Sequence, residues 1–282
     1  MAWNCDKCKD TLKFVAEFED TIVGNKQLAY WSGIGCESAL AFAERGVRVA
    51  VFADLNLDAA LTASERSKDI ATAKDCETVA LHVPQRVAAD ILTVNEPDYN
   101  YLQEINLKGI LHCLQKDISA MKDQEAQFAE GRSGRREVGP GAIINITSLS
   151  ALSGTVQSTT YVASKFAARG IIKCDALENC ASGLRINEVC LGFTNTPMLQ
   201  RGIQKQPGGG EILNKSMLLG CVAMPEEIAS VVHFLASPSA SFITCRSIAV
   251  DAGVSVNVLT RTFFFSDWTE TESCLVQIWI EI

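Results

Sequence analysis

A tyrosine and a lysine lie four residues apart, at Tyr161 and Lys165, in the stretch TTYVASKFAARG. Side chains at this spacing project from one face of a helix. A phenol whose pKa is near 10 must drop by roughly 3 units to exchange protons at neutral pH, a preference of about 4 kcal/mol. A cation about 4 Å away supplies a similar amount at an effective dielectric near 20. The pair therefore predicts an acid/base centre in which Lys165 activates Tyr161.

Two further polar residues extend this centre. Ser148 follows a strongly apolar stretch, 13 residues before Tyr161, and can donate a hydrogen bond to a substrate oxygen. Asn106 lies in a long helical pattern and can hold a water molecule that relays a proton to Lys165. A tyrosine and a lysine at this spacing are usually only a surface pair. The expectation of chemistry therefore depends on Ser148 and on the sheet pattern around it.

Alternating strands and helices must position these residues. Strands are expected at 27–31, 47–53, 78–83, 90–94, 142–147 and 184–190, and helices at 37–45, 57–73, 102–121 and 159–181. This alternation predicts an α/β fold, with a doubly wound, Rossmann-like parallel sheet in a single domain. Residues 84–89 are too few for a parallel crossover, so the helix between the third and fourth strands is missing or shortened. Residues 122–141, rich in charge and glycine, predict an exposed loop insertion.

The stretch WSGIGCESALAFAERG predicts a phosphate-binding turn that leads into a helix. Ser32, Gly33, Ile34 and Gly35 can offer backbone N–H groups and a positive helix end to a pyrophosphate. Asp54 follows Gly35 by 19 residues, close to the spacing at which a carboxylate meets an adenosine ribose. There it would repel a 2′-phosphate, which favours NAD(H) over NADP(H). The glycines at Gly33 and Gly35 and the carboxylate of Asp54 each have a purely structural explanation as well, because glycine suits any tight turn and aspartate also caps helices.

Composition and charge limit the kinds of molecule that the chain is expected to bind. The chain has 282 residues, of which 48% are hydrophobic, and a net charge of −8. A sizeable core is therefore expected, and nucleic acid is not an expected partner. We find neither an apolar signal segment at the N-terminus nor a run long enough to span a membrane, so a cytoplasmic location is expected. The histidines are isolated from one another, and no metal site is expected.

The chain resembles a short-chain dehydrogenase/reductase over about residues 28–253. The Asn-Ser-Tyr-Lys tetrad of that family maps onto Asn106, Ser148, Tyr161 and Lys165. The resemblance implies an NAD(P)-dependent oxidoreductase that interconverts a secondary alcohol and a ketone on a small-molecule substrate. In such an enzyme Tyr161 transfers the proton, Ser148 polarises the carbonyl, and Lys165 also binds the cofactor ribose.

The resemblance implies further contacts and an assembly. Lys108 lies in an Asn-x-Lys-Gly element whose basic residue is often near the cofactor, and Thr194 and Thr196 lie in a segment similar to the one that covers the nicotinamide. The family forms homodimers or homotetramers through the helices expected here at 102–121 and 159–181. The insertion at 122–141 is similar to that of fungal members, which implies a role in fungal secondary metabolism.

The chain also departs from the family pattern. The Thr-Gly opening of the phosphate turn is absent before Ser32, and the Asn-Asn-Ala-Gly element is reduced to Asn95, Glu96 and Pro97. Residues 1–24 form a polar extension, and residues 254–282 have no family counterpart. These departures predict a weak cofactor site in a degraded or misassembled cofactor half, and their abruptness favours a misassembled gene model. Two alternatives stay open: a cofactor-free pseudoenzyme, and a non-redox isomerase or dehydratase.

Overall fold

A computed structural model describes residues 26–30, 34–44, 49–53, 75–79, 91–204, 208–256 and 276–280. Two sheets form its centre. The first is parallel, in the order β1-β2-β3, from β1 (Lys26–Tyr30), β2 (Val49–Ala53) and β3 (Asp75–Val79). The second has the order β8-β7-β6-β9, from β6 (Ala142–Ile146), β7 (Arg185–Leu191), β8 (Ser247–Val250) and β9 (Val276–Ile280). In this sheet β6, β7 and β8 are parallel, and β9 is antiparallel.

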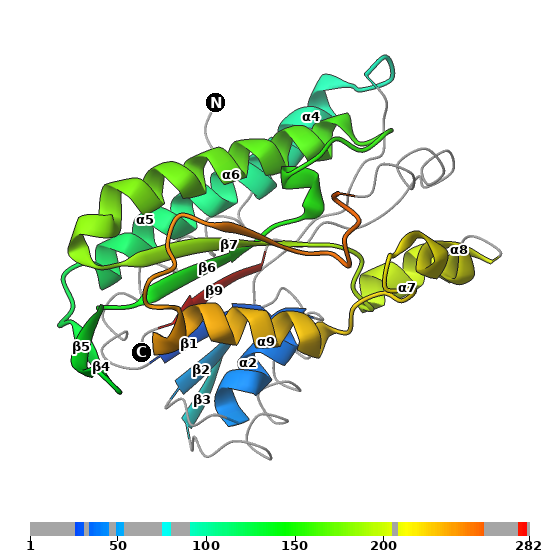
Figure 1. Ribbon diagram of the computed structural model, residues 1–282. Coiled ribbons are helices and arrows are strands. Elements are labelled where there is room, and N and C mark those ends of the chain that lie inside the picture. Colours follow the sequence, from blue (N-terminus) through cyan, green and yellow to red (C-terminus); the bar gives the residue numbers. More distant parts are fainter. Residues whose placement is uncertain are drawn as a thin grey trace.

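The strand β9 joins the two sheets. It pairs with β6 so that Val276 lies opposite Ile146 and Ile280 opposite Ala142. On its other side it runs beside β1, and in Figure 1 the dark red arrow lies between these two strands. In space the strands therefore follow the order β3-β2-β1-β9-β6-β7-β8. A strand from the segment beyond residue 253 thus lies within the sheet, which the sequence patterns did not predict.

The strand expected at 90–94 is wrong. Residues 91–93 form a turn, in which Ile91 and Leu92 are 71% and 92% exposed. The physical reason is the short connection before them, because a parallel strand needs about a dozen residues or more to cross over. The place beside β6 is taken by β9 instead. The third strand, expected at 78–83, begins earlier, at Asp75, and is described as β3 to Val79, while residues 80–83 lie outside the described residues.

One face of the second sheet is covered by two long helical segments (Figure 1). The first runs without a break through α4 (Glu96–Gln103), the π-helical turn η2 (Glu104–Lys108) and α5 (Gly109–Met121). The second is α6 (Thr159–Asn179), which confirms the helix expected at 159–181. The two helices and the sheet share one apolar cluster of Ile110, Leu114, Met121, Ile143, Ala168, Ile172, Ala176, Leu184 and Ile186.

The π-helical turn changes which residues of the first segment face the core. Buried positions recur at Leu102, Asn106, Ile110 and Leu114, four apart rather than 3.6. A π-helical turn holds more residues than an α-helical turn and shifts the buried face in this way. Ile110 and Leu114 are accordingly buried, whereas Ile105, Leu107 and Leu111 are only half-buried.

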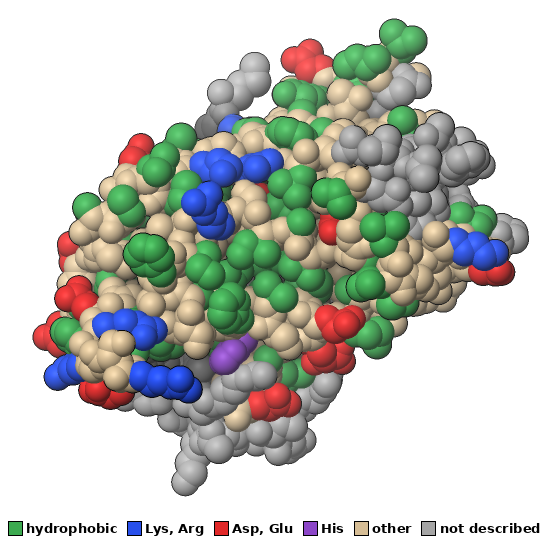
Figure 2. Space-filling view, viewed as in Figure 1, with side chains coloured by type: hydrophobic (Ala, Val, Ile, Leu, Met, Phe, Trp, Pro, Cys, Tyr) green, Lys and Arg blue, Asp and Glu red, His purple; other side chains and the backbone are tan. Residues whose placement is uncertain are grey.

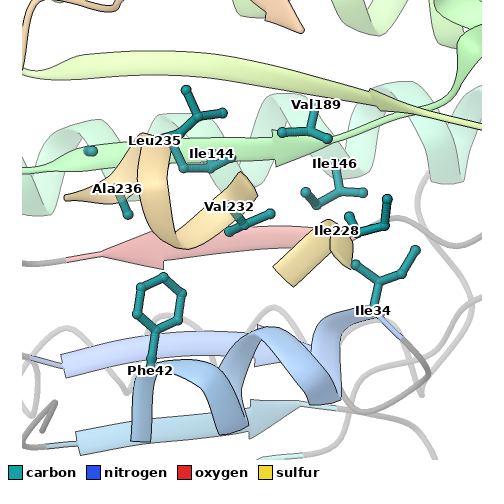
Figure 3. Packing of buried hydrophobic residues seen from close by; sticks show 10 residues of the cluster. Ile34, Phe42, Ile144, Ile146, Val189, Ile228, Val232, Leu235 and Ala236 are labelled. Atoms are coloured by element: carbon teal, nitrogen blue, oxygen red, sulfur yellow. The ribbon is translucent and has the colours of Figure 1, made fainter. Parts of the chain in front are cut away.

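The opposite face carries α2 (Ile34–Glu44) and α9 (Pro225–Ala236). Figure 3 shows Ile34 and Phe42 of α2 on the same cluster as Ile228 and Val232 of α9, against the side of β6 that holds Ile144 and Ile146. Because Ile143 faces the other helix layer, β6 is buried on both faces. Helices on both sides of a mostly parallel sheet confirm the α/β fold.

The segment expected as an exposed loop at 122–141 is mostly exposed, but it forms a β-hairpin. Its strands are β4 (Gln127–Gly131) and β5 (Gly134–Gly139). The Arg135 guanidinium lies 4.2 Å from the centre of the Phe128 ring across the hairpin. Arg136 donates a hydrogen bond of 2.8 Å to the carbonyl of Pro238, which ties the hairpin to the domain. Both strands are largely exposed and rich in charge, so they lack the alternating apolar pattern by which a half-buried strand is predicted.

The remaining elements lie near the carboxyl edge of the sheet or outside the described residues. The helices α7 (Pro197–Gln204) and α8 (Gly209–Ser216) follow β7. The helix expected at 57–73 and the residue Asp54 lie outside the residues that the structure describes. None of the described helices is long and apolar enough to cross a bilayer.

Candidate active site

Tyr161 and Lys165 lie in the first two turns of α6. The Lys165 side chain is fully buried, and its Nζ lies 5.4 Å from the centre of the Tyr161 ring. The expected shared face is therefore present. The lysine ammonium lies over the phenol ring at a distance typical of a cation–π contact.

Asn106 is held against α6 by the π-helical turn η2. Its Nδ2 donates a hydrogen bond of 3.0 Å to Ser164 Oγ, and Ser164 Oγ donates one of 2.7 Å to the carbonyl of Tyr161. Asn106 is fully buried. Isolated π-helical turns occur often at functional sites, where the extra residue redirects a side chain. This turn brings Asn106 to the helix that carries Tyr161 and Lys165.

Two buried polar atoms of this group make no hydrogen bond within the part of the chain that the structure describes: Lys165 Nζ and Asn106 Oδ1. A buried polar group without a partner costs about 1–3 kcal/mol, and a charged one costs more. Such atoms in a native fold usually meet a ligand or ordered water. The ammonium offers three donors, which suit the vicinal hydroxyls of a ribose, and the amide oxygen can accept from a water molecule. The residues present therefore fit a nucleotide cofactor.

Ser148 follows the carboxyl end of β6. Its Oγ accepts a hydrogen bond of 3.1 Å from the backbone N–H of Ser150 and so caps the short helix η3 (Leu149–Ala151). A hydroxyl that accepts in this way keeps its own proton to donate. Because η3 packs on α6, Ser148 belongs to the same end of the sheet as Tyr161.

The residues expected at the phosphate turn are described only in part. The helix α2 begins at Ile34, three residues before the expected start at Glu37, so Ile34 and Gly35 form its first turn, and both are buried. Ser32 and Gly33 lie outside the described residues, as does Asp54. The N-terminal end of a helix that follows a β-strand offers free N–H groups to an anion.

The other expected cofactor contacts have partners of their own. Lys108 is exposed and forms an ion pair with Glu104 one turn earlier. Thr194 is buried beside Ala223, and its Oγ1 donates a long hydrogen bond of 3.5 Å to the carbonyl of Gly192. Thr196 Oγ1 accepts a hydrogen bond of 3.3 Å from the N–H of Leu199 at the start of α7. These contacts do not bring Lys108 into the group around Tyr161, and Thr196, which accepts in its hydrogen bond, keeps its own hydroxyl proton to donate.

Sequence reasoning missed Ser164 and three residues around Ser148, namely Thr147, Arg169 and Glu188. A signal existed for Glu188, because it interrupts the buried strand RINEVCL with a charge. The same carboxylate lies near Cys190. Burial first, and then the charge of Glu188, raise the pKa of the Cys190 thiol to about 12. Cys190 is therefore not a nucleophile of this site.

Comparison with known proteins adds a family match, two relatives and a solved structure. The sequence model of the enoyl-(acyl carrier protein) reductase family matches residues 76–255. The short-chain dehydrogenase anuF of Penicillium roqueforti is 31% identical over 81% of this chain and 94% of its own length. A cyclohexanol dehydrogenase of an Acinetobacter species is 28% identical over 78% of this chain and 90% of its own. Among solved structures, an actinorhodin polyketide ketoreductase with NADPH matches with a TM-score of 0.69, at 20% identity, over 82% of this chain and 97% of that one.

Proposed function

The chain belongs to the short-chain dehydrogenase/reductase family of NAD(P)-dependent oxidoreductases, and from this premise we propose that it interconverts a secondary alcohol and a ketone. The observation that carries the proposal is the fully buried Lys165 ammonium 5.4 Å from the Tyr161 ring. A buried cation beside a phenol costs stability, and it is useful where the phenol must give up and regain a proton.

Each member of the group has a role in the proposed reaction. The Tyr161 hydroxyl donates its proton to the carbonyl oxygen during reduction and removes the alcohol proton during oxidation. Ser148 donates a hydrogen bond to the same oxygen, which stabilises the charge that develops there. Lys165 stabilises the phenolate and binds the ribose hydroxyls, while Asn106 Oδ1 accepts from a water molecule that returns protons toward Lys165. The nicotinamide, when bound, exchanges a hydride with the substrate carbon.

We propose that a pyrophosphate is bound, weakly, by the first turn of α2, which contains Ile34 and Gly35, together with Ser32 and Gly33, which precede it in the sequence. Glu37 also lies in this turn. A carboxylate there already interacts with the positive end of the helix, so a phosphate gains less from the same field. Asp54 makes NAD(H) the preferred cofactor in this proposal, because a carboxylate repels the 2′-phosphate of NADP(H).

The substrate that we propose is a small ring compound with a secondary alcohol or ketone. The name of the Acinetobacter relative indicates that it acts on a cyclic secondary alcohol of this kind, and that of the ketoreductase indicates a polyketide substrate. We also propose a role in fungal secondary metabolism, as the resemblance of the insertion at 122–141 to that of fungal members implies, and the Penicillium relative is likewise a fungal short-chain dehydrogenase.

We further propose a homodimer or homotetramer. Phe166 and Leu177 of α6 are 44% and 65% exposed, which leaves apolar surface on the helix that the family uses for pairing. On the face shown in Figure 2, hydrophobic side chains lie between dispersed acidic and basic ones. A second copy of the chain would cover such surface. Light scattering that shows a monomer at micromolar concentration would contradict this part of the proposal.

The proposed reaction is tested by following the oxidation of NADH and of NADPH with a panel of cyclic ketones, with Tyr161→Phe as the matched control. The expected result is turnover by the wild-type protein and its loss in Tyr161→Phe, since this change removes the transferable proton and little packing. A fall of less than about tenfold would contradict the role of Tyr161. Two outcomes would favour the alternatives. The absence of saturable NAD(P)H binding at millimolar concentration indicates a pseudoenzyme, and turnover without nicotinamide indicates a non-redox enzyme.

A further inference from the structure

A buried carboxylate lies beside the residue that precedes Ser148. Glu188 is at the centre of β7 and only 1% of its side chain is exposed. Its Oε1 accepts a hydrogen bond of 2.7 Å from Thr147 Oγ1, and Thr147 N–H also bonds to the carbonyl of Val189. An apolar side chain would fill a buried strand position at a lower desolvation cost. The hydrogen bond to Thr147 is therefore the contact that explains a carboxylate at this place.

An arginine reaches the same region from the helix of the acid/base pair. Arg169 lies one turn after Lys165 on α6, and its side chain is 28% exposed. Its Nη1 donates a hydrogen bond of 3.0 Å to the carbonyl of Ala151, the last residue of η3. Its Nε lies 3.9 Å from Glu188 Oε2, close enough for attraction but without a hydrogen bond. Arg169 thus joins α6 to η3 and places a positive charge near the buried carboxylate.

From this arrangement we propose that Thr147, Glu188 and Arg169 are positioning residues for Ser148. Glu188 fixes the residue before Ser148 to β7, and Arg169 fixes the end of the short helix that Ser148 caps. Arg169 is part of α6, the helix that carries Tyr161, and Glu188 is part of β7, the strand that packs against α6. The inference rests on the proposed reductase function, because it gives Ser148 a substrate oxygen to contact.

The positioning role follows from the precision that such chemistry requires. A donor stabilises the charge on a reacting oxygen only within hydrogen-bond distance of it, and a displacement of about 1 Å can cost about 100-fold in rate. Ser148 itself has no hydrogen bond to α6 among the described contacts, and its turn is held to that helix through Arg169. Without the arginine, η3 would keep its own backbone bonds and its packing on α6 but lose the hydrogen bond that ties its last carbonyl to that helix.

The test compares two arginine-to-methionine variants. Arg169→Met removes the bond to Ala151, and Arg136→Met is the matched control, because Arg136 also donates to a backbone carbonyl, that of Pro238, at 2.8 Å. We expect kcat of Arg169→Met to fall by about tenfold, which corresponds to about 1.4 kcal/mol, while KM changes less than kcat. The kcat of Arg136→Met should stay at the wild-type value. A kcat for Arg169→Met within twofold of wild type, or an equal loss in both variants, would overturn the proposal.

A second measurement does not depend on activity. The amides of Ala151, Leu152 and Ser153 bond to the carbonyls of Ser148 and Leu149. Their hydrogen exchange should become about tenfold faster in Arg169→Met and stay unchanged in Arg136→Met, because only the first variant releases η3 from α6. If the wild-type protein shows no turnover, the proposed reductase function fails. The amide hydrogen exchange of η3 then still tests whether Arg169 holds this short helix. Unchanged exchange in Arg169→Met would refute it.

A double substitution tests whether Arg169 and Glu188 are energetically coupled. Glu188→Gln keeps an oxygen for Thr147 Oγ1 but removes the charge that Arg169 balances. In the Arg169→Met background the carboxylate is buried without its cation, so adding Glu188→Gln should raise the unfolding temperature, whereas Glu188→Gln alone should not. Additive effects of the two changes would show that Arg169 and Glu188 are not coupled, which contradicts the proposed network.

Discussion

Replacing Lys165 by methionine should make the cofactor-free protein more stable and nearly inactive. The lysine is fully buried, and within the described residues its Nζ has no hydrogen-bond partner. Methionine has a similar length, no charge and a flexible stem that fills irregular space. The substitution therefore removes the cost of the buried ammonium while it keeps most of the packing.

The expected changes in unfolding temperature and in kcat can be given as approximate magnitudes. A buried polar group without a partner costs about 1–3 kcal/mol, and for a chain of this length each kcal/mol changes the unfolding temperature by about 2 °C. We therefore expect the unfolding temperature of Lys165→Met to rise by about 2–6 °C. The ammonium lies 5.4 Å from the Tyr161 ring. In the proposed reaction its loss removes both the cation beside the phenol and the contact to the ribose, so kcat should fall by about 100-fold, the lower end of what a positioned acid–base group contributes.

The assay combines calorimetry with steady-state kinetics. The unfolding temperature of wild type and Lys165→Met is measured without cofactor and again with millimolar NADH, which should stabilise the wild type more because it alone can bind the ribose through Nζ. A leucine variant at the same position controls for packing. The reasoning is refuted if Lys165→Met unfolds at or below the wild-type temperature without cofactor while its kcat stays within tenfold.

Three further predictions concern other parts of the chain. With a thiol pKa raised to about 12, roughly one in 10⁴ molecules carries the Cys190 thiolate at pH 8. Mass spectrometry should then find iodoacetamide on the exposed Cys221 long before Cys190, and equal labelling in the native protein would contradict the burial of Cys190. Gly139→Ala places a Cβ 2.1 Å from the carbonyl oxygen of Gly183 at a φ of +85°, so denaturant titration should show a loss of about 3 kcal/mol or more, and a loss below 1 kcal/mol would mean that this contact relaxes freely. Inserting Thr-Gly-Ala-Ala before Ser32 should tighten NAD(H) binding at least tenfold in a fluorescence titration, because each restored charge-assisted hydrogen bond contributes about 1.5–3 kcal/mol. Unchanged affinity would show that the phosphate turn is not the weak point.

Local patterns predicted the elements whose signal lies in their own residues. The strand β6 reads Ala-Ile-Ile-Asn-Ile, an apolar run that only a doubly covered strand can bury, and it was predicted almost to the residue. The helix α6 and the shared face of Tyr161 and Lys165 follow in the same way from helical spacing. These parts depend on contacts within one turn or one strand.

The parts that sequence reasoning missed depend on distant contacts or on unusual backbone geometry. The segment of β9, VQIWI, alternates as a strand does, but its partner β6 is far away in the chain, so its place inside the sheet could not be inferred from its own residues. The π-helical turn at Asn106 breaks the 3.6-residue period that the prediction used. The bonds from Arg169 to Ala151 and from Thr147 to Glu188 join residues 18 and 41 positions apart, so only tertiary packing reveals them.

The position of β9 has a consequence for the protein during its synthesis. Val276 follows its partner Ile146 by 130 residues (276 − 146). At about 5–20 residues per second, a ribosome needs roughly 7–26 seconds to translate that interval. Throughout it, one edge of β6 in the nascent chain lacks the strand that later covers it, and an open apolar edge pairs readily with other chains. The open edge of β6 is thus exposed to pairing with other chains during this interval, so synthesis that slows between residues 146 and 280 should increase aggregation.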